Sequence, residues 1–65
     1  MSIKSAREKA GMTQKQVASA LHVNQSAVAH WETNRTQPTA AKLAILAELF
    51  NCTVDELLDR DAERR

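Results

Sequence analysis

With 65 residues, the chain is long enough for one small domain and too short for two. Its lone cysteine excludes a disulfide bond within the chain, and Cys52, His22 and His30 lack the spacing of a zinc site. The first residues contain no apolar segment of a signal peptide, and the run "LAILAELF" is far too short to span a bilayer. We therefore expect a cytoplasmic protein without a metal site, cofactor or membrane partner.

The net charge of +1 is unevenly distributed along the chain. Residues 1–50 carry six basic and three acidic side chains, a net charge of +3, whereas residues 51–65 carry three arginines and five acidic side chains, a net charge of −2. A mildly basic body with an acidic tail permits nucleic-acid binding but does not require it.

The scarcity of glycine, proline and aromatic residues favours an all-helical fold. The first predicted helix follows Ser2 as its N-cap and ends at Gly11, which suits a left-handed position after a helix. The second begins at Thr13, and its spacing from Gln16 is that of a capping box. The third begins after Asn24 and runs to about residue 33.

A loop containing Pro38 separates the third predicted helix from the fourth, since proline cannot donate to a helix. Thr39 is the expected N-cap of the fourth helix, and Asn51 marks its end. Thr53 and Glu56 have the spacing of a second capping box and open a fifth helix. The fourth helix carries an apolar stripe at helical spacing: Leu43, Leu46, Ala47 and Phe50.

The connection between the second and third helices is very short. Only His22 and Val23 lie between Leu21 and the N-cap Asn24, so the two helices must cross steeply. This arrangement is typical of a helix-turn-helix unit, here spanning about residues 13–33. Apolar side chains are expected to hold this corner together: Ala18, Leu21, Val23, Val28 and Trp31.

The third helix has one apolar side and one uncharged polar side when its residues are placed at about 100° intervals. The polar face consists of Gln25, Ser26, Ala29 and His30. Base edges in the major groove present hydrogen-bonding groups and the thymine methyl group, which suit glutamine, serine and alanine side chains. This face carries no acidic residue, which would repel phosphate. The sequence therefore predicts base contacts here, although an ordinary solvated surface is the alternative.

The stretch "GMTQKQVASALHVNQSAVAHWETNRTQPTAAKLAILAELFNCTVDELL" resembles the helix-turn-helix domain of phage repressors and Cro proteins, which are regulators of the xenobiotic-response-element type. The resemblance covers about residues 3–58. It implies an all-α, lambda-repressor-like bundle of five helices, formed by residues 1–65 as one domain. It further implies that a dimer binds double-stranded operator DNA.

Several residue roles follow from this resemblance. Gln14 corresponds to a glutamine that contacts phosphate and braces the third helix, and Arg7 with Glu32 corresponds to a buried salt bridge. His22 departs from the family, which usually has glycine there, so we expect some strain at this turn. Contacts with the DNA backbone are predicted for Thr13, Gln14, Lys15, Asn24, Asn34, Arg35 and Thr36. Lys15, like Lys42, either contacts phosphate or only solubilises its helix.

The favoured function is therefore a sequence-specific transcriptional regulator of the repressor type, binding a pseudo-palindromic operator. The alternative is an antitoxin or adaptor that binds mainly a protein partner. Catalysis is not expected, because Cys52 is remote in sequence from both histidines. We expect no effector-binding domain after the fifth helix and therefore no small-molecule effector. The dimer surface is expected at Val54, Leu57 and Leu58, and the tail at residues 60–65 is expected to be frayed.

Overall fold

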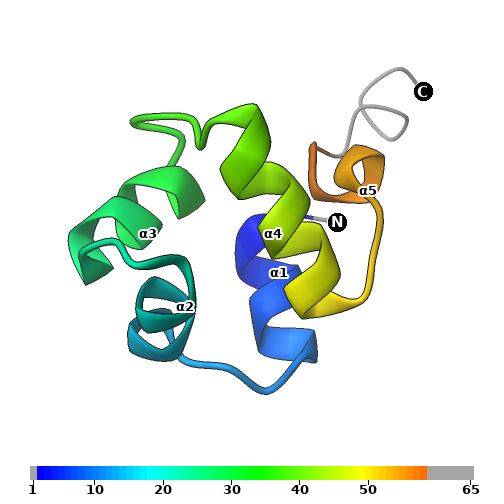
Figure 1. Cartoon of the computed structure of the whole chain (residues 1–65), viewed down its shortest axis with the longest axis horizontal. Helices are drawn as coiled ribbons and strands as arrows, with labels where there is room; N and C mark the ends of the chain where they lie inside the picture. Colours follow the sequence, from blue (N-terminus) through cyan, green and yellow to red (C-terminus); the bar gives the residue numbers. More distant parts are fainter. Residues whose placement is uncertain (1, 59–65) are drawn as a thin grey trace.

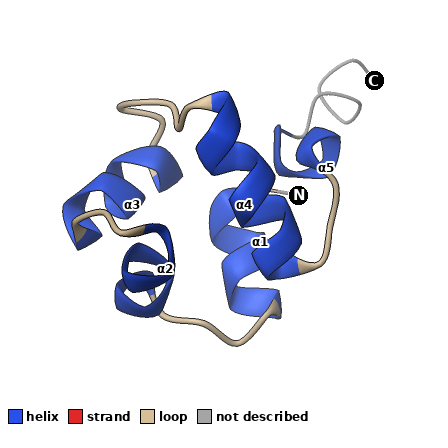
Figure 2. Ribbon diagram, in the orientation of Figure 1, coloured by secondary structure: helices blue, strands red, loops and turns tan. Residues whose placement is uncertain are grey.

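The computed structural model describes residues 2–58, and within them the chain forms five α-helices and no strand (Figures 1 and 2). The helices are α1 (Ile3–Lys9), α2 (Gln14–Leu21), α3 (Gln25–Glu32), α4 (Ala40–Phe50) and α5 (Val54–Leu58). The all-helical prediction is therefore confirmed. The predicted frayed tail at 60–65 lies outside the described residues. Within residues 2–58, no helix has the length and apolar content needed to cross a membrane.

The helices begin where side-chain caps were predicted. The Thr13 hydroxyl accepts a hydrogen bond from the Gln16 N–H at 3.0 Å, and the Gln16 carboxamide accepts one from the Thr13 N–H at 2.8 Å. The hydroxyls of Ser2, Thr39 and Thr53 likewise accept an N–H hydrogen bond at the starts of α1, α4 and α5, and of these three helices only α4 lacks the reciprocal bond to the N-cap N–H. Asn24 differs, because it precedes α3 in an extended conformation but its side chain makes no capping hydrogen bond.

Helices α1 to α4 share one way of ending. Each is followed by a residue with positive φ: Gly11 (72°), His22 (58°), Asn34 (63°) and Asn51 (57°). The N–H of the next residue then bonds to the carbonyl five positions back: Met12 to Arg7, Val23 to Ala18, Arg35 to His30, and Cys52 to Ala47. These are Schellman endings, which satisfy carbonyl groups that a helix end leaves without partners. His22, at the turn where strain was expected, is one of these residues with positive φ.

A single core joins the five helices. Helices α1 and α4 lie in the middle of the molecule, α2 and α3 on one side, and α5 on the other (Figure 1). The core side chains are Ile3, Ala6, Val17, Ala18, Leu21, Val28, Trp31, Leu46, Ala47, Phe50 and Leu57. Val23 and Leu43, also predicted to be apolar contacts, are half-buried and pack against this core. Residues from α2, α3 and α4 thus fix the corner that positions α3.

Candidate nucleic-acid interface

Helix α3 is held by its apolar side and presents its polar face outward. Val28 is fully buried and Trp31 is 8% exposed, so neither is available to a ligand. On the opposite side, two residues of the polar face are exposed and two are half-buried: Gln25 and Ser26, then Ala29 and His30. The structure therefore brings all four predicted base-contacting residues to one side of a rigidly packed helix.

The first residues of α2 and α3 lie next to each other. The Gln25 carboxamide nitrogen is 3.4 Å from the Gln14 carboxamide oxygen, and these two residues open α3 and α2 respectively. Neither helix has an acidic residue in its first turn, and the Asn24 side chain leaves the start of α3 uncapped. Helix N-termini carry partial positive charge and free N–H groups, so this pair of helix starts favours an anion such as phosphate.

An ion pair lies beneath the polar face. The Arg7 Nε atom donates to Glu32 Oε2 at 2.7 Å, and the Gln14 carboxamide donates to Glu32 Oε1 at 3.0 Å. The Glu32 and Arg7 side chains are only 4% and 13% exposed. Arg7 also donates to the Met12 carbonyl at 2.8 Å. Both carboxylate oxygens are thus occupied, which neutralises the only acidic group of α3 and ties α1, α2 and α3 together.

The loop after α3 is held against the end of that helix. The His30 carbonyl accepts hydrogen bonds from the backbone N–H groups of Arg35 at 2.9 Å and Thr36 at 3.5 Å. The Thr33 hydroxyl donates to the Ala29 carbonyl at 3.1 Å. The predicted backbone-contacting residues therefore fall into two groups, one at the starts of α2 and α3 and one in this loop: Thr13, Gln14, Lys15 and Asn24, then Asn34, Arg35 and Thr36. Except for half-buried Gln14, all are exposed.

The geometry agrees with comparisons to known proteins. A family described as "Helix-turn-helix" matches residues 3–57, nearly all of the described chain. The chain belongs to this helix-turn-helix family. It is 36% identical over 59 residues to the HTH-type transcriptional regulator ImmR of Bacillus subtilis, covering 91% of this chain and 46% of ImmR. It is also 36% identical over 47 residues to the HTH-type transcriptional activator BcrR of Enterococcus faecalis, covering 72% of this chain and 23% of BcrR.

The helix-turn-helix protein thus spans less than half the length of these two curated relatives. No solved structure matches the chain.

The residues predicted to form a dimer surface lie on α5, away from α3 (Figure 1). Leu57 is only 4% exposed and belongs to the protein's own core, so it has almost no surface left for a second subunit. Val54 and Leu58 are half-buried. Of the three predicted residues, Val54 and Leu58 therefore retain more surface for a second copy than Leu57 does.

Lys42 makes a contact within the protein that sequence analysis did not predict. Sequence analysis gave its ammonium two alternatives, contact with phosphate or a solubilising role, and did not consider a contact within the protein. The half-buried Lys42 Nζ atom donates to the Leu21 carbonyl at 3.0 Å. A local signal existed, because Lys42 occupies the position after Thr39 where a capping box has glutamate or glutamine.

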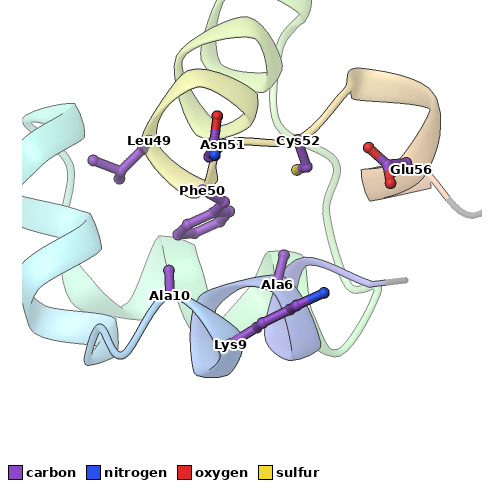
Figure 3. A pocket seen from close by; sticks show the side chains of 8 residues that line it. All are labelled: Ala6, Lys9, Ala10, Leu49, Phe50, Asn51, Cys52 and Glu56. Carbon is purple, nitrogen blue, oxygen red and sulfur yellow. The ribbon is translucent and has the colours of Figure 1, made fainter.

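A hollow of about 430 Å³ lies between α1, the end of α4 and the start of α5 (Figure 3). It is lined by Ala6, Lys9, Ala10, Leu49, Phe50, Asn51, Cys52 and Glu56. Burial raises the pKa of the Cys52 thiol, and the negative charge of Glu56 raises it further. The thiol therefore stays protonated at neutral pH and is a poor nucleophile. Sequence analysis did not anticipate this hollow, which is formed by segments far apart in the chain.

Proposed function

We propose that this helix-turn-helix protein is a sequence-specific DNA-binding transcriptional regulator that places α3 in the major groove. The observation that carries the proposal is the uncharged polar face of α3, projecting outward from a helix whose other side is anchored by Val28 and Trp31. Such a helix presents hydrogen-bonding groups in a fixed orientation. Direct readout of base edges requires both the hydrogen-bonding groups and their fixed orientation.

Each residue of the polar face has a chemical role in this proposal. Gln25 donates to and accepts from one adenine edge, since its carboxamide has both kinds of group. Ser26 follows it in the first turn of α3, where a recognition helix usually meets the bases. Ala29 contacts a thymine methyl group, and His30 donates to guanine or to a phosphate. Gln14 holds Gln25 from the side through the 3.4 Å contact between their carboxamides.

Phosphate contacts set the register of α3 in the groove. They come from the adjoining starts of α2 and α3, with Lys15 beside them, and from the loop with Arg35. These are few cations, so one subunit should bind weakly. We infer that two subunits bind a pseudo-palindromic site, with their α3 helices about 34 Å apart in successive major grooves. Val54 and Leu58 are the proposed contacts between the subunits.

We infer that the regulator represses transcription. Blocking a promoter requires only that the operator be occupied, whereas activation also requires a productive contact with the transcription machinery. Repression therefore requires fewer contacts from residues 2–58 than activation does.

The decisive experiment selects bound sequences from a random DNA pool and then compares variants on the selected site and on random DNA. We expect Gln25→Ala to weaken operator binding by about 1–3 kcal/mol while leaving random DNA almost unaffected. Gln37→Ala is the matched control, because Gln37 is exposed in the loop and has no proposed contact. Equal losses on both DNAs would show that Gln25 does not read bases.

Salt dependence separates this function from the alternative of a protein-binding antitoxin or adaptor. Gel shifts at increasing salt should show a steep fall in affinity, because phosphate binding releases counterions. If the protein retained no DNA at low salt, the proposed function would be wrong, and a search for a protein partner would be the next step.

A further inference from the structure

We propose that Lys42 is a positioning residue for α3: its ammonium, bound to the Leu21 carbonyl, holds the turn between α2 and α3 in the geometry that DNA reading requires. This inference rests on the proposed function, because its consequence for binding presumes that α3 enters the groove. Two observations support it: Lys42 is unfavourable for its own helix, and its tertiary contact offsets this disadvantage.

The local disadvantage lies at the start of α4. Lys42 is the third residue of this helix, and its N–H donates to the Thr39 hydroxyl at 3.2 Å. The side chain at the equivalent position accepts a hydrogen bond from the N-cap N–H in α1, α2 and α5: Ser5, Gln16 and Glu56. A lysine has no acceptor, so α4 lacks this second bond. Its positive charge also lies near the positive end of the α4 dipole.

The Lys42 charge is unfavourable near the start of α4, but its tertiary contact places it at a helix end where a positive charge is favourable. Leu21 is the last residue of α2, and its carbonyl belongs to the negative end of that helix. Lys42 Nζ reaches this carbonyl at 3.0 Å, from a half-buried position beside the core side chain of Leu21. A hydrogen bond with a charged donor is stronger than one between neutral groups, and partial burial limits competition from water. Lys42 therefore acts on α2 rather than on its own helix.

The position of the bound carbonyl determines what this contact controls. The Leu21 carbonyl belongs to the peptide that joins α2 to His22, which has a φ of 58° without being glycine. Only Val23 and Asn24 then precede α3. A rotation of this peptide would change the direction in which α3 leaves the turn. Lys42 holds the beginning of α3 in this way, while Glu32, bound to Arg7 and Gln14, holds its end.

The test compares three variants on the selected operator and on random DNA, at several salt concentrations. Lys42→Met keeps the length of the side chain and removes its charge, Lys42→Arg keeps a donor for the carbonyl, and Lys15→Met removes an exposed cation from α2 as the control. We expect Lys42→Met to weaken operator binding about tenfold, with random-DNA affinity and the salt dependence unchanged. Lys42→Arg should restore most of the operator affinity.

A phosphate-binding lysine behaves differently. Its loss weakens binding to both DNAs and reduces the slope of log K against log salt by about 0.9, the result we expect for Lys15→Met. The same result for Lys42→Met would overturn the proposal, as would an operator affinity that stays within about twofold of the parent. A partly unfolded variant would also lose affinity equally on both DNAs, so binding is measured at a temperature where circular dichroism shows every variant to be folded.

A measurement without DNA separates this proposal from the proposed function. In nuclear magnetic resonance spectra, Lys42→Met should shift the backbone amide signals of residues 22–28 and speed their hydrogen exchange, and Lys42→Arg should reverse both effects. If these signals matched the parent, Lys42 would not position the turn. If they changed but the parent showed no preference among DNA sequences, the proposed function would fail and the role of Lys42 in the turn would stand.

Discussion

The connection between α2 and α3 and the connection between α4 and α5 have nearly the same backbone. Each contains three residues, and the first is left-handed: His22 at φ 58° and ψ 43°, and Asn51 at φ 57° and ψ 49°. The N–H of the second residue bonds to the carbonyl five positions back in both cases. The third residue is the N-cap position of the next helix. One short turn therefore occurs twice in the same small fold.

The two connections differ in how the following helix begins. Thr53 caps α5 with its hydroxyl, Glu56 completes the capping box, and Asp55 adds another negative charge to the first turn. Asn24 provides no such bond to α3, and the first turn of α3 has no acidic residue. The start of α5 is thus closed by the protein's own groups, whereas that of α3 is left open. The same turn therefore leads into a capped helix start at one corner and into an uncapped helix start at the other.

The largest expected effect comes from the ion pair that ties α3, the helix after the first of these connections, to α1. Replacing Glu32 by Gln leaves the Arg7 charge without its partner in a mostly buried site, so we expect the free energy of unfolding to fall by about 3–5 kcal/mol. Urea unfolding at neutral pH measures this loss. The double variant Arg7→Met with Glu32→Leu should recover much of it, because both charges are removed together. Single variants as stable as the parent would exclude a stabilising role for the pair.

The difference in capping is tested by two matched alanine substitutions. Thr53→Ala removes a hydroxyl that caps α5 and should lower the free energy of unfolding by about 1 kcal/mol. Asn24→Ala removes a side chain that makes no capping bond, so its effect on stability should be much smaller. The same Asn24 variant should weaken DNA binding. If both variants lost the same stability, the contrast between the two helix starts would be wrong.

Because the first residue of both turns is left-handed, glycine at either position should stabilise the protein. The gain in unfolding free energy should differ between the two positions. His22→Gly should raise the free energy of unfolding by about 0.5–1 kcal/mol, since glycine adopts positive φ without steric cost. Asn51→Gly should gain less, because asparagine already tolerates this conformation. Thermal melts compare the two variants with the parent. A lower melting temperature for His22→Gly would mean that the imidazole makes a stabilising contact at this turn.

The smallest expected effect is the loss, at low pH, of the stability that Glu56 contributes at the capped start of α5. Hydrogen bonds from the Thr53 backbone and hydroxyl lower the pKa of Glu56. A carboxyl whose pKa is lower in the folded than in the unfolded state stabilises the protein above its ordinary pKa, about 4.3, and loses that contribution as the pH falls through the folded value. The difference in unfolding free energy between the parent and Glu56→Gln should therefore shrink between about pH 6 and pH 3. A constant difference across this range would contradict the assignment.

Helix boundaries were predictable because their causes are local. A hydroxyl three residues before Gln16 or Glu56 and a glycine or asparagine after an apolar stripe act within one turn of the chain. The polar face of α3 was also visible in advance, since periodicity alone places Gln25 and Ser26 opposite Val28 and Trp31. The contact between Arg7 and Glu32 was expected only from resemblance to known repressors, because nothing local joins residues 25 positions apart.

The sequence by itself determined the number of helices, their caps and ends, and the side of α3 that faces outward, because each depends on groups only a few residues apart. Only the tertiary structure decided how the remaining side chains are used. It placed the Lys42 ammonium against the Leu21 carbonyl, placed Leu57 in the core, and formed a hollow beside Cys52. These outcomes depend on the directions in which whole helices pack, and those directions arise from many apolar contacts acting together.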